Sequence, residues 1–254
     1  MNHPDQDRHE RRRILLALDY ARDQVTLKAA ALLAKSMRAS LDAIFVEDEE
    51  LRRVAQLPFA CEIGFGSAVV RRMELPRLER DQRNRATELQ RLLRRQAAAS
   101  RVQWSFSVTR GSLPAAALAA LPEADLYILP RRNGYLEQQR HIPGVITTLL
   151  DGSPQSLHAL EAAAALSDHV PLRILVPMSK KGNALRARAM PLLHRLQHAA
   201  LFIPIEDLSP ETIAANVRAI GASLLVLGHA GQFCDEGVLK ALQSATGTPL
   251  ILAN

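Results

Sequence analysis

The sequence is poor in aromatic residues, cysteine and long apolar runs, and each shortage excludes a class of protein. Aromatic residues make up 4% of the 254 residues, and the two cysteines, Cys61 and Cys234, lie far apart without a CxxC partner. This favours a reduced, cytoplasmic protein over a disulfide scaffold or a zinc framework. No apolar run approaches the roughly 18 residues of a membrane span, and the run ILLAL near the start is too short for a secretory signal. We therefore expect a cytoplasmic protein without a membrane partner.

Positive charge is concentrated in one segment of the first half. The formal net charge is +6, and residues 71–95 contain nine arginines and four acidic residues. Acids and arginines alternate there at helical spacings, which is typical of a solvated amphipathic helix. No aromatic residues are interleaved to stack on bases, and no helix-turn-helix or zinc pattern is present. Nucleic-acid binding is therefore not expected from this segment.

A repeated unit divides the chain into two related parts. The strand-like run at 14–19 is followed by TLKAAALLAKSM and a second strand, and the run at 146–151 is followed by ALEAAAALS and a second strand. The two copies are offset by about 132 residues. This repeat predicts one domain over residues 1–142 and another over residues 143–254.

Strands alternate with helices in both parts, which indicates parallel sheets covered by helices on both faces. In residues 1–142 we predict strands at 14–19, 41–46, 102–109 and 125–130, with helices near 23–38, 73–99 and 112–121. In residues 143–254 we predict strands at 146–151, 171–177, 200–206, 223–228 and 249–253, with helices near 154–168, 183–198, 209–220 and 236–245. The predicted fold class is α/β, with two Rossmann-like, doubly wound parallel-sheet domains in tandem.

The two predicted domains are unequal. The first has no counterpart of the closing helix and strand of the second, so it either lacks them or shares the strand around residues 145–150 with its neighbour. It has instead an insertion over residues 47–72, whose fold the sequence leaves open. Two such domains are also expected to pair, either within the chain or in a homodimer.

Candidate ligand contacts lie where the predicted strands of the second domain end, because ligands of open parallel sheets bind beyond the carboxyl ends of the strands. Asp151 ends the first strand, where its carboxylate can accept hydrogen bonds either from a nucleoside or from the amides of its own turn. Gly228 and Gly231, in the turn GHAG, could let backbone N–H groups approach phosphate oxygens. His229 in that turn is either a ligand contact or a solvated turn residue.

No pattern in the sequence supports catalysis. His194 and His198 have the i, i+4 spacing of metal ligands on a helix, but no third ligand is evident. Cys234 lies near a predicted helix start without a partner base. GxSxG and Walker motifs are absent from the sequence. We therefore expect no catalytic residues, no metal and no enzyme activity.

The second domain resembles the universal stress protein family. The resemblance lies in DGSPQSLHALEAAAALS after the first strand, in ASLLVLGHAG before the closing helix and in the final strand PLIL. It covers most of residues 143–254 and, more loosely, residues 11–132, as in the tandem form of that family. The resemblance implies an adenine nucleotide alpha hydrolase-like fold. It also implies that nucleotide binding would use the family motif G-x2-G-x9-G-[ST], together with the aspartate at the end of the first strand.

The chain departs from that motif in ways that weaken phosphate binding. Five residues rather than nine separate Gly231 from Gly237, and Val238 lacks the expected hydroxyl. Asp235 and Glu236 lie where phosphates need donors, and they would repel the phosphate charge. The resemblance thus implies a weak site formed by Asp151, Val176, Gly228, His229, Gly231 and Gly237.

The corresponding turn of the first domain has Pro130 and Asn133 at the glycine positions, although Arg131 and Arg132 could hold an anion in another way. Proline has no N–H to offer a phosphate. The function implied by the resemblance is that of a non-enzymatic stress-response binding or adaptor protein with a degenerate nucleotide site. It would act on an unidentified protein partner and have no firm cofactor. The alternative is a regulatory switch that binds ATP or AMP, weakly, in the second domain.

Overall fold

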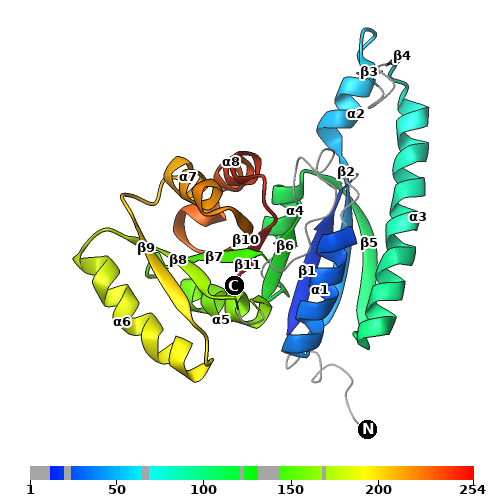
Figure 1. The fold of residues 1–254 in the computed structure, drawn as a ribbon. Helices are drawn as coiled ribbons and strands as arrows, with labels where there is room; N and C mark the ends of the chain where they lie inside the picture. The colour runs from blue at the N-terminus through cyan, green and yellow to red at the C-terminus, as the bar shows by residue number, and fades with distance from the viewer. Residues whose placement is uncertain (1–11, 20–23, 64–68, 121–122, 131–143, 168–169) are drawn as a thin grey trace.

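The computed structural model describes residues 12–19, 24–63, 69–120, 123–130, 144–167 and 170–254, which form one nine-stranded sheet with helices on both faces (Figure 1). In spatial order the strands are β5 (Trp104–Gly111), β2 (Ser40–Asp48), β1 (Arg13–Leu18), β6 (Leu126–Leu129), β11 (Leu250–Ala253), β10 (Ala222–Gly228), β7 (Val145–Leu149), β8 (Leu172–Pro177) and β9 (Ala200–Ile205). All neighbours are parallel except β6 and β11.

The helices form two layers, one on each face of the sheet. One layer consists of α1 (Gln24–Met37), α3 (Leu75–Ser100), α5 (Pro154–Leu166) and α6 (Lys180–Arg195). The other consists of α4 (Leu113–Ala120), α7 (Pro210–Ile220), α8 (Glu236–Thr246) and the 3-10 helix η3 (Gly231–Cys234). None of the helices in the described parts of the chain is long and apolar enough to cross a membrane.

The apolar runs of the strands form two cores because neighbouring residues of a strand point to opposite faces. In β1, Ile14 and Leu16 join the core under α1 and α3, whereas Leu15 and Ala17 join the core under α4 and α8. Each core contains residues from both parts of the chain. This explains why the strands read as unbroken apolar runs rather than as alternating patterns.

The repeat predicted from the sequence is present in the strand order. From the outer edge inward, each part of the chain places its third, second, first and fourth main strands in that order, which gives β5-β2-β1-β6 in one and β9-β8-β7-β10 in the other. The predicted α/β architecture is therefore confirmed. Ser153 and Ser209 begin α5 and α7, because each hydroxyl accepts a bond from the amide three residues on.

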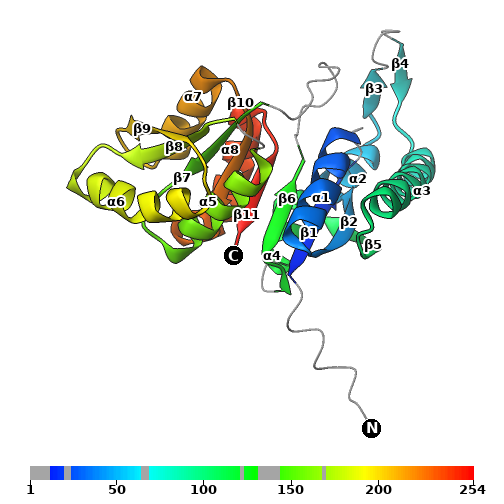
Figure 2. The same ribbon diagram turned by 60° about the horizontal axis from the view of Figure 1, so that its bottom comes forward.

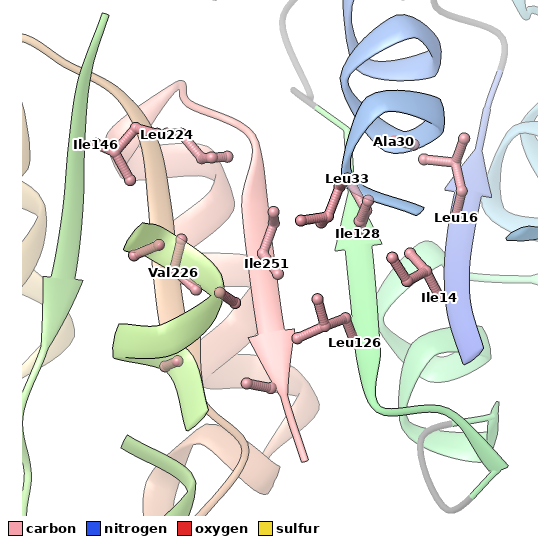
Figure 3. Packing of buried hydrophobic residues seen from close by; sticks show 14 of the residues in the cluster. Ile14, Leu16, Ala30, Leu33, Leu126, Ile128, Ile146, Leu224, Val226 and Ile251 are labelled. Carbon is pink, nitrogen blue, oxygen red and sulfur yellow. The ribbon is translucent and has the colours of Figure 1, made fainter. Parts of the chain in front are cut away.

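The two parts meet where β6 pairs antiparallel with β11, a pairing that the sequence did not predict. Tyr127 lies opposite Leu252, and Ile128 lies opposite Ile251. Figure 3 shows Ile251 of β11 facing the side chains of β6 within the shared core. Figure 2 shows α1 and α5 on the same face near this seam, where the two helices touch. We call the β6–β11 junction the seam.

The strand around residues 145–150 is not shared between the two parts. β7 pairs with β8 and β10, so it belongs to the second part alone. The described residues contain no fifth main strand of the first part, and β11 occupies the place beside β6 instead. The inner edge of the first part is thus covered by the closing strand of the second part, so that the edges of β6 and β11 pair with each other instead of facing solvent.

The insertion forms an arm that projects away from the sheet (Figure 1). It contains α2 (Glu49–Ala55) and a separate hairpin of β3 (Cys61–Ile63) and β4 (Val70–Arg72), and it leans on the start of α3. Asp48 begins α2 by accepting bonds from the amides of Glu50 at 2.8 Å and Leu51 at 3.1 Å. The predicted second strand therefore runs on to Asp48, directly into the arm.

The arginine-rich segment, residues 71–95, forms part of the hairpin strand β4 and most of α3. The helix is exposed on one side, as the sequence predicted. Eight of its nine arginines are exposed, and Arg85 is buried beside the sheet. Arg85 donates to Glu88 at 2.7 Å. The side of α3 opposite the exposed arginines faces the core with Ala86, Leu89 and Leu93. The segment is therefore amphipathic in the way that its spacing predicted.

Candidate functional site

The carboxyl ends of β8, β7 and β10 bring three of the predicted site residues together. Leu150 donates from its amide to the carbonyl oxygen of Leu175 at 3.0 Å, which places Val176 beside the end of β7. The pairing of β10 with β7, continued by two residues, places Gly228 on the other side of Leu150. Asp151 follows at the rim between them. The structure therefore assembles Asp151, Val176 and Gly228 at one edge of the sheet.

Asp151 is used by its own turn. Its Oδ1 accepts from the amide of Ser153 at 2.8 Å and from the Ser153 hydroxyl at 2.6 Å. The same arrangement recurs before α7, where Asp207 accepts from the amide of Ser209 at 2.9 Å and from its hydroxyl at 2.5 Å. Hydrogen bonds from Ser209 lower the pKa of Asp207. Of the two roles considered for Asp151, the structure thus contains the turn contact, while Oδ2 accepts no bond from the described residues.

Gly228 makes room for α5. A methyl group added to its Cα would lie 2.6 Å from the carbonyl carbon of Gln155 and 2.6 Å from the amide nitrogen of Ser156. These are backbone atoms of the first turn of α5, which cannot move aside without moving the helix. The glycine predicted to admit a phosphate therefore admits the start of a helix, which packs directly against the end of β10.

The turn after β10 is tied to the closing strand. The amide of His229 donates to the carbonyl oxygen of Ala253 at 2.7 Å, and burial lowers the pKa of the His229 imidazole. The ring Nε2 is buried and has no hydrogen-bond partner among the described residues. Gly231 has a φ of +56°, which glycine adopts without strain, and the η3 helix then buries Phe233 in the core. The loop is therefore anchored rather than open.

The start of α8 is already capped by a carboxylate. Oδ1 of Asp235 accepts from the amide of Val238 at 2.9 Å, and a methyl group added at Gly237 would lie 3.0 Å from the same oxygen. Glu236 accepts from the hydroxyl of Ser112, at the start of α4, at 2.5 Å. Gly237 thus lies beside two carboxylates, in a turn where the N–H of Val238 already donates to Asp235.

The matching position in the first part of the chain is covered by α8. The carbonyl oxygen of Pro130 accepts from Nε2 of Gln243 at 2.7 Å, and Gln243 is 1% exposed. Proline provides no N–H for a phosphate. Arg131, Arg132 and Asn133, the other residues considered there, lie outside the described residues.

Lys181 is a charged residue near the site that sequence reasoning missed. Its side chain lies over the turn after Asp151, because a methyl group added at Gly152 would be 3.5 Å from Nζ. Lys181 belongs to the first turn of α6, which Ser179 begins by accepting from the amide of Gly182 at 3.3 Å. The signal in the sequence was the run Ser-Lys-Lys just after the second strand. The ammonium group of Lys181 therefore lies beside the carboxyl ends of the strands.

The predicted helix face shared by His194 and His198 does not form. α6 ends at Arg195, and His198 follows Gln197, whose φ is +52°. Within the described residues, no group of three histidines, cysteines or carboxylates could hold a metal ion. Cys234 is exposed at the end of η3.

Two cavities of the described part lie away from the site. One, of about 20 Å³, lies within the core at the seam, between residues such as Leu33, Ile128 and Ile251. The other, of about 170 Å³, lies in the arm between α2, the hairpin and α3. Neither is lined by any of the six predicted site residues.

Comparison with known proteins identifies the fold. No protein-family model matches the sequence, and neither does any curated protein. The chain is similar in structure to a universal stress protein from Archaeoglobus fulgidus DSM 4304, with a TM-score of 0.54 and 12% identity over 95% of this chain and 96% of that chain. The fold is that of a universal stress protein. A protein of the universal stress protein family from Burkholderia pseudomallei is 24% identical over 45% of this chain and 98% of that chain, with a TM-score of 0.36.

Proposed function

We propose that the chain is a universal stress protein without enzyme activity, which serves the stress response as a binding or adaptor protein and whose nucleotide site has lost most of its affinity for phosphate. The structural similarity over nearly the whole chain supports the family. The capping of α8 by Asp235 is the observation that carries the rest.

A helix start binds phosphate when its N–H groups are free, because the amides and the helix dipole both favour an anion there. In α8 the Asp235 carboxylate takes that place, and Glu236 follows directly. A triphosphate would have to displace the first carboxylate and would be repelled by both. Losing two or three charge-assisted hydrogen bonds of roughly 1.5–3 kcal/mol each weakens binding about a hundredfold or more. The proposal therefore sets the affinity for ATP no better than high micromolar.

A second candidate function is a switch that binds AMP or adenosine in the second part of the chain. Two observations favour it over ATP binding. Oδ2 of Asp151 remains available to an adenine amino group or a ribose hydroxyl, and Lys181 offers a positive charge beside the same turn. A ligand with one phosphate or none needs less of the start of α8.

Calorimetry with ATP, AMP and adenosine separates these functions, together with a search for nucleotide released when the purified protein is denatured. Under the proposal, wild-type protein releases none and binds ATP weakly. Asp235→Ser keeps a capping oxygen but removes the charge, so it should bind ATP several-fold more tightly. Asp48→Ser is the matched control, since Asp48 caps α2 in the arm.

Three outcomes would contradict the proposal. Submicromolar binding of ATP by the wild-type protein would show that the start of α8 admits phosphates after all. ATP binding that disappears when Arg131 and Arg132 are replaced would place the site in the first part of the chain. Steady hydrolysis of ATP would show that the protein is an enzyme.

A further inference from the structure

Positive charge in the second part of the chain is concentrated on α6. Residues 143–254 contain eight lysines and arginines and eight acidic residues, so this part has no net charge. Six of its eight cations, and none of its acids, lie within residues 169–205, and five of the six belong to α6. α6 packs on β8 and β9 at the outer end of the sheet (Figure 1, Figure 2). A helix without any acidic residue thus lines one end of the molecule.

The two sides of α6 differ in chemistry. The side that faces the sheet places Leu185, Ala189 and Leu193 in the core. The outer side exposes three cations, two alanines and Met190, whose exposed fraction is 54%. The core thus takes the leucines of the helix, and the outer side is left with its charge. We call these six exposed residues the α6 face: Lys180, Lys181, Ala184, Ala187, Arg188 and Met190.

Two of the five cations of α6 are used within the chain. Arg195 pairs with Glu161 of α5 at 2.8 Å, and the guanidinium group of Arg186 lies 5.4 Å from the centroid of the Phe202 ring. The other three belong to the α6 face and form no ion pair with a described residue. They are the cations that a partner could still pair with.

The carboxylates near the start of α6 lie on other elements. Asp151 follows β7 and accepts two bonds from Ser153 in its own turn. Glu206 follows β9 and is exposed, and it forms no ion pair with a lysine of α6. With Glu161 already paired, these two acids stand against all the remaining cations of the helix. The α6 face therefore keeps an excess of positive charge.

The cations of the α6 face do not stabilise the helix. In α3, some arginines pair with acids three or four residues away, as Arg77 does with Asp81 at 3.9 Å. α6 contains no acid for such a pair, and Lys180 and Lys181 occupy its first turn, where the helix dipole favours anions and disfavours cations. The solvated-helix interpretation that fits α3 therefore does not fit α6. Charge that the fold does not use, gathered on one exposed helix, indicates a surface for an anionic partner.

We propose that the α6 face binds an acidic amphipathic helix of another protein, which lies along α6. The carboxylates of that helix would pair with Lys180, Lys181 and Arg188. Its apolar side chains would cover Met190 and pack on the two alanines, whose small side chains let a second helix approach closely. This inference rests on the proposed adaptor function and names the surface and the chemistry of its partner.

Chemistry distinguishes this occupant from others. A second copy of the chain that docked through its own α6 face would set cations against cations. Nucleic acid would pair with the cations, but it offers no apolar surface to Met190, and alanine side chains form no hydrogen bonds with base edges. An anionic membrane would need large apolar side chains to anchor the helix, and the leucines of α6 lie in the core or against it. An acidic amphipathic helix supplies both carboxylates and apolar side chains.

The proposal is tested by selecting peptides that bind the immobilised wild-type chain from a random library displayed on phage. Peptides of about 20 residues are used, because shorter ones rarely form helices in water. Enriched peptides are synthesised with a fluorescein label and titrated by fluorescence polarisation. We expect them to carry acidic and apolar residues at helical spacing and to bind more weakly as salt is raised.

Charge reversal on the α6 face should weaken this binding. A chain with Lys180→Glu, Lys181→Glu and Arg188→Glu should show a Kd raised about tenfold or more, because attraction becomes repulsion. Glutamine at the same three positions removes the charge without reversing it and should also raise Kd. Met190→Ser should raise Kd by removing an apolar contact. Circular dichroism of each variant checks that the chain is folded.

The matched control makes the same change of net charge on the other basic helix. Arg80→Glu, Arg91→Glu and Arg94→Glu reverse three arginines of α3 that are exposed and form no ion pair with a described residue. α3 packs at the opposite end of the sheet from α6, so the control should leave Kd unchanged.

Every other outcome overturns the proposal. No enrichment, enrichment without acidic residues, or equal effects of the α6 and α3 substitutions would each reject it. If the α6 substitutions abolish self-association of the wild-type chain, binding of duplex DNA or flotation with phosphatidylglycerol vesicles, the α6 face belongs to a second copy, to nucleic acid or to a membrane. Peptides that bind elsewhere would reject the α6 face and leave the adaptor function standing, whereas tight ATP binding or hydrolysis would reject that function whatever the peptides show.

Discussion

Gln243 of α8 donates a 2.7 Å hydrogen bond from Nε2 to the carbonyl oxygen of Pro130, and both residues are buried. The bond connects residues 113 positions apart, at the end of β6 beside the seam. Pro130 lies just after β6, so its carbonyl would otherwise be a buried acceptor without a donor. A helix of the second part of the chain therefore completes the polar contacts of the first part.

Replacing Gln243 should destabilise the whole chain. Gln243→Met keeps most of the volume but leaves the Pro130 carbonyl unpaired, which costs about 1–3 kcal/mol. Gln90→Met, at an exposed position of α3, is the control and should change the free energy of unfolding by less than about 0.5 kcal/mol. Urea unfolding monitored by circular dichroism measures both. Equal, small effects of the two substitutions would mean that the carbonyl finds another donor.

Gly228→Ala should be more destabilising than an alanine that only strains the backbone. The added methyl group meets two backbone atoms of α5 at 2.6 Å, and such overpacking costs about 1–3 kcal/mol or more. Gly221→Ala is the matched control, because Gly221 has a φ of +66° with no atom within 4 Å of the added methyl group. Its cost should be about 1 kcal/mol. An equal or smaller loss at Gly228 would contradict the tight packing of α5 on β10.

The pH dependence of stability should contain a contribution from His229. Burial lowers its pKa in the folded chain, so the unfolded chain binds more protons as the pH falls through its ordinary value of 6.5. The contribution to stability is therefore present above that pH and is lost during acidification. Guanidinium unfolding of wild type and His229→Gln between about pH 7.5 and 5.5 tests this, and the variant should lose less stability. His194→Gln, at an exposed position, is the control, and a loss as steep in His229→Gln as in wild type would exclude the contribution.

The arginines of α3 should give at most weak, nonspecific attraction to DNA. They lie on a single exposed helix, and no pattern in the sequence supplies base contacts or stacking aromatics. Fluorescence anisotropy with a labelled duplex in about 0.15 M salt should show no saturable binding. A steep salt-dependent affinity, lost when Arg83, Arg91 and Arg94 are changed to glutamate, would prove this interpretation wrong.

Most elements could be predicted from the sequence because their signals are local. The apolar run at 14–19 and the alanine-rich segment ALEAAAALS predicted β1 and α5, since buried strands and helices leave such patterns. The hairpin of the arm left none, because Ile63 and Val70 face outward and three-residue strands have no alternation to read. The seam was also invisible, because β6 and β11 are buried along their whole length and any apolar strand would serve equally well.

The structure gives the predicted site residues contacts that the sequence did not specify. Gly228 was expected to let a phosphate approach the backbone, and the group that lies close to it in the structure is the first turn of α5. Asp151 correctly indicated a hydrogen-bonding carboxylate, and the sequence alone left its partner open between a ligand and Ser153. Asp235 was expected to repel phosphates, and the structure adds that it also occupies an amide they would need. A residue type predicts the chemistry it can do, whereas its partner depends on the packing of distant elements.

The seam also has a consequence for the order in which the protein matures. β11 begins about 120 residues after β6 ends. At roughly 5–20 residues per second, translation leaves the edge of β6 unpaired for about 6–24 s after it is made. Throughout that interval the nascent first unit presents a free apolar strand, the feature through which chains stick to one another. The first part of the chain is therefore completed only when the second part has been made. A polypeptide that ends between β6 and β11 should aggregate through the unpaired edge of β6.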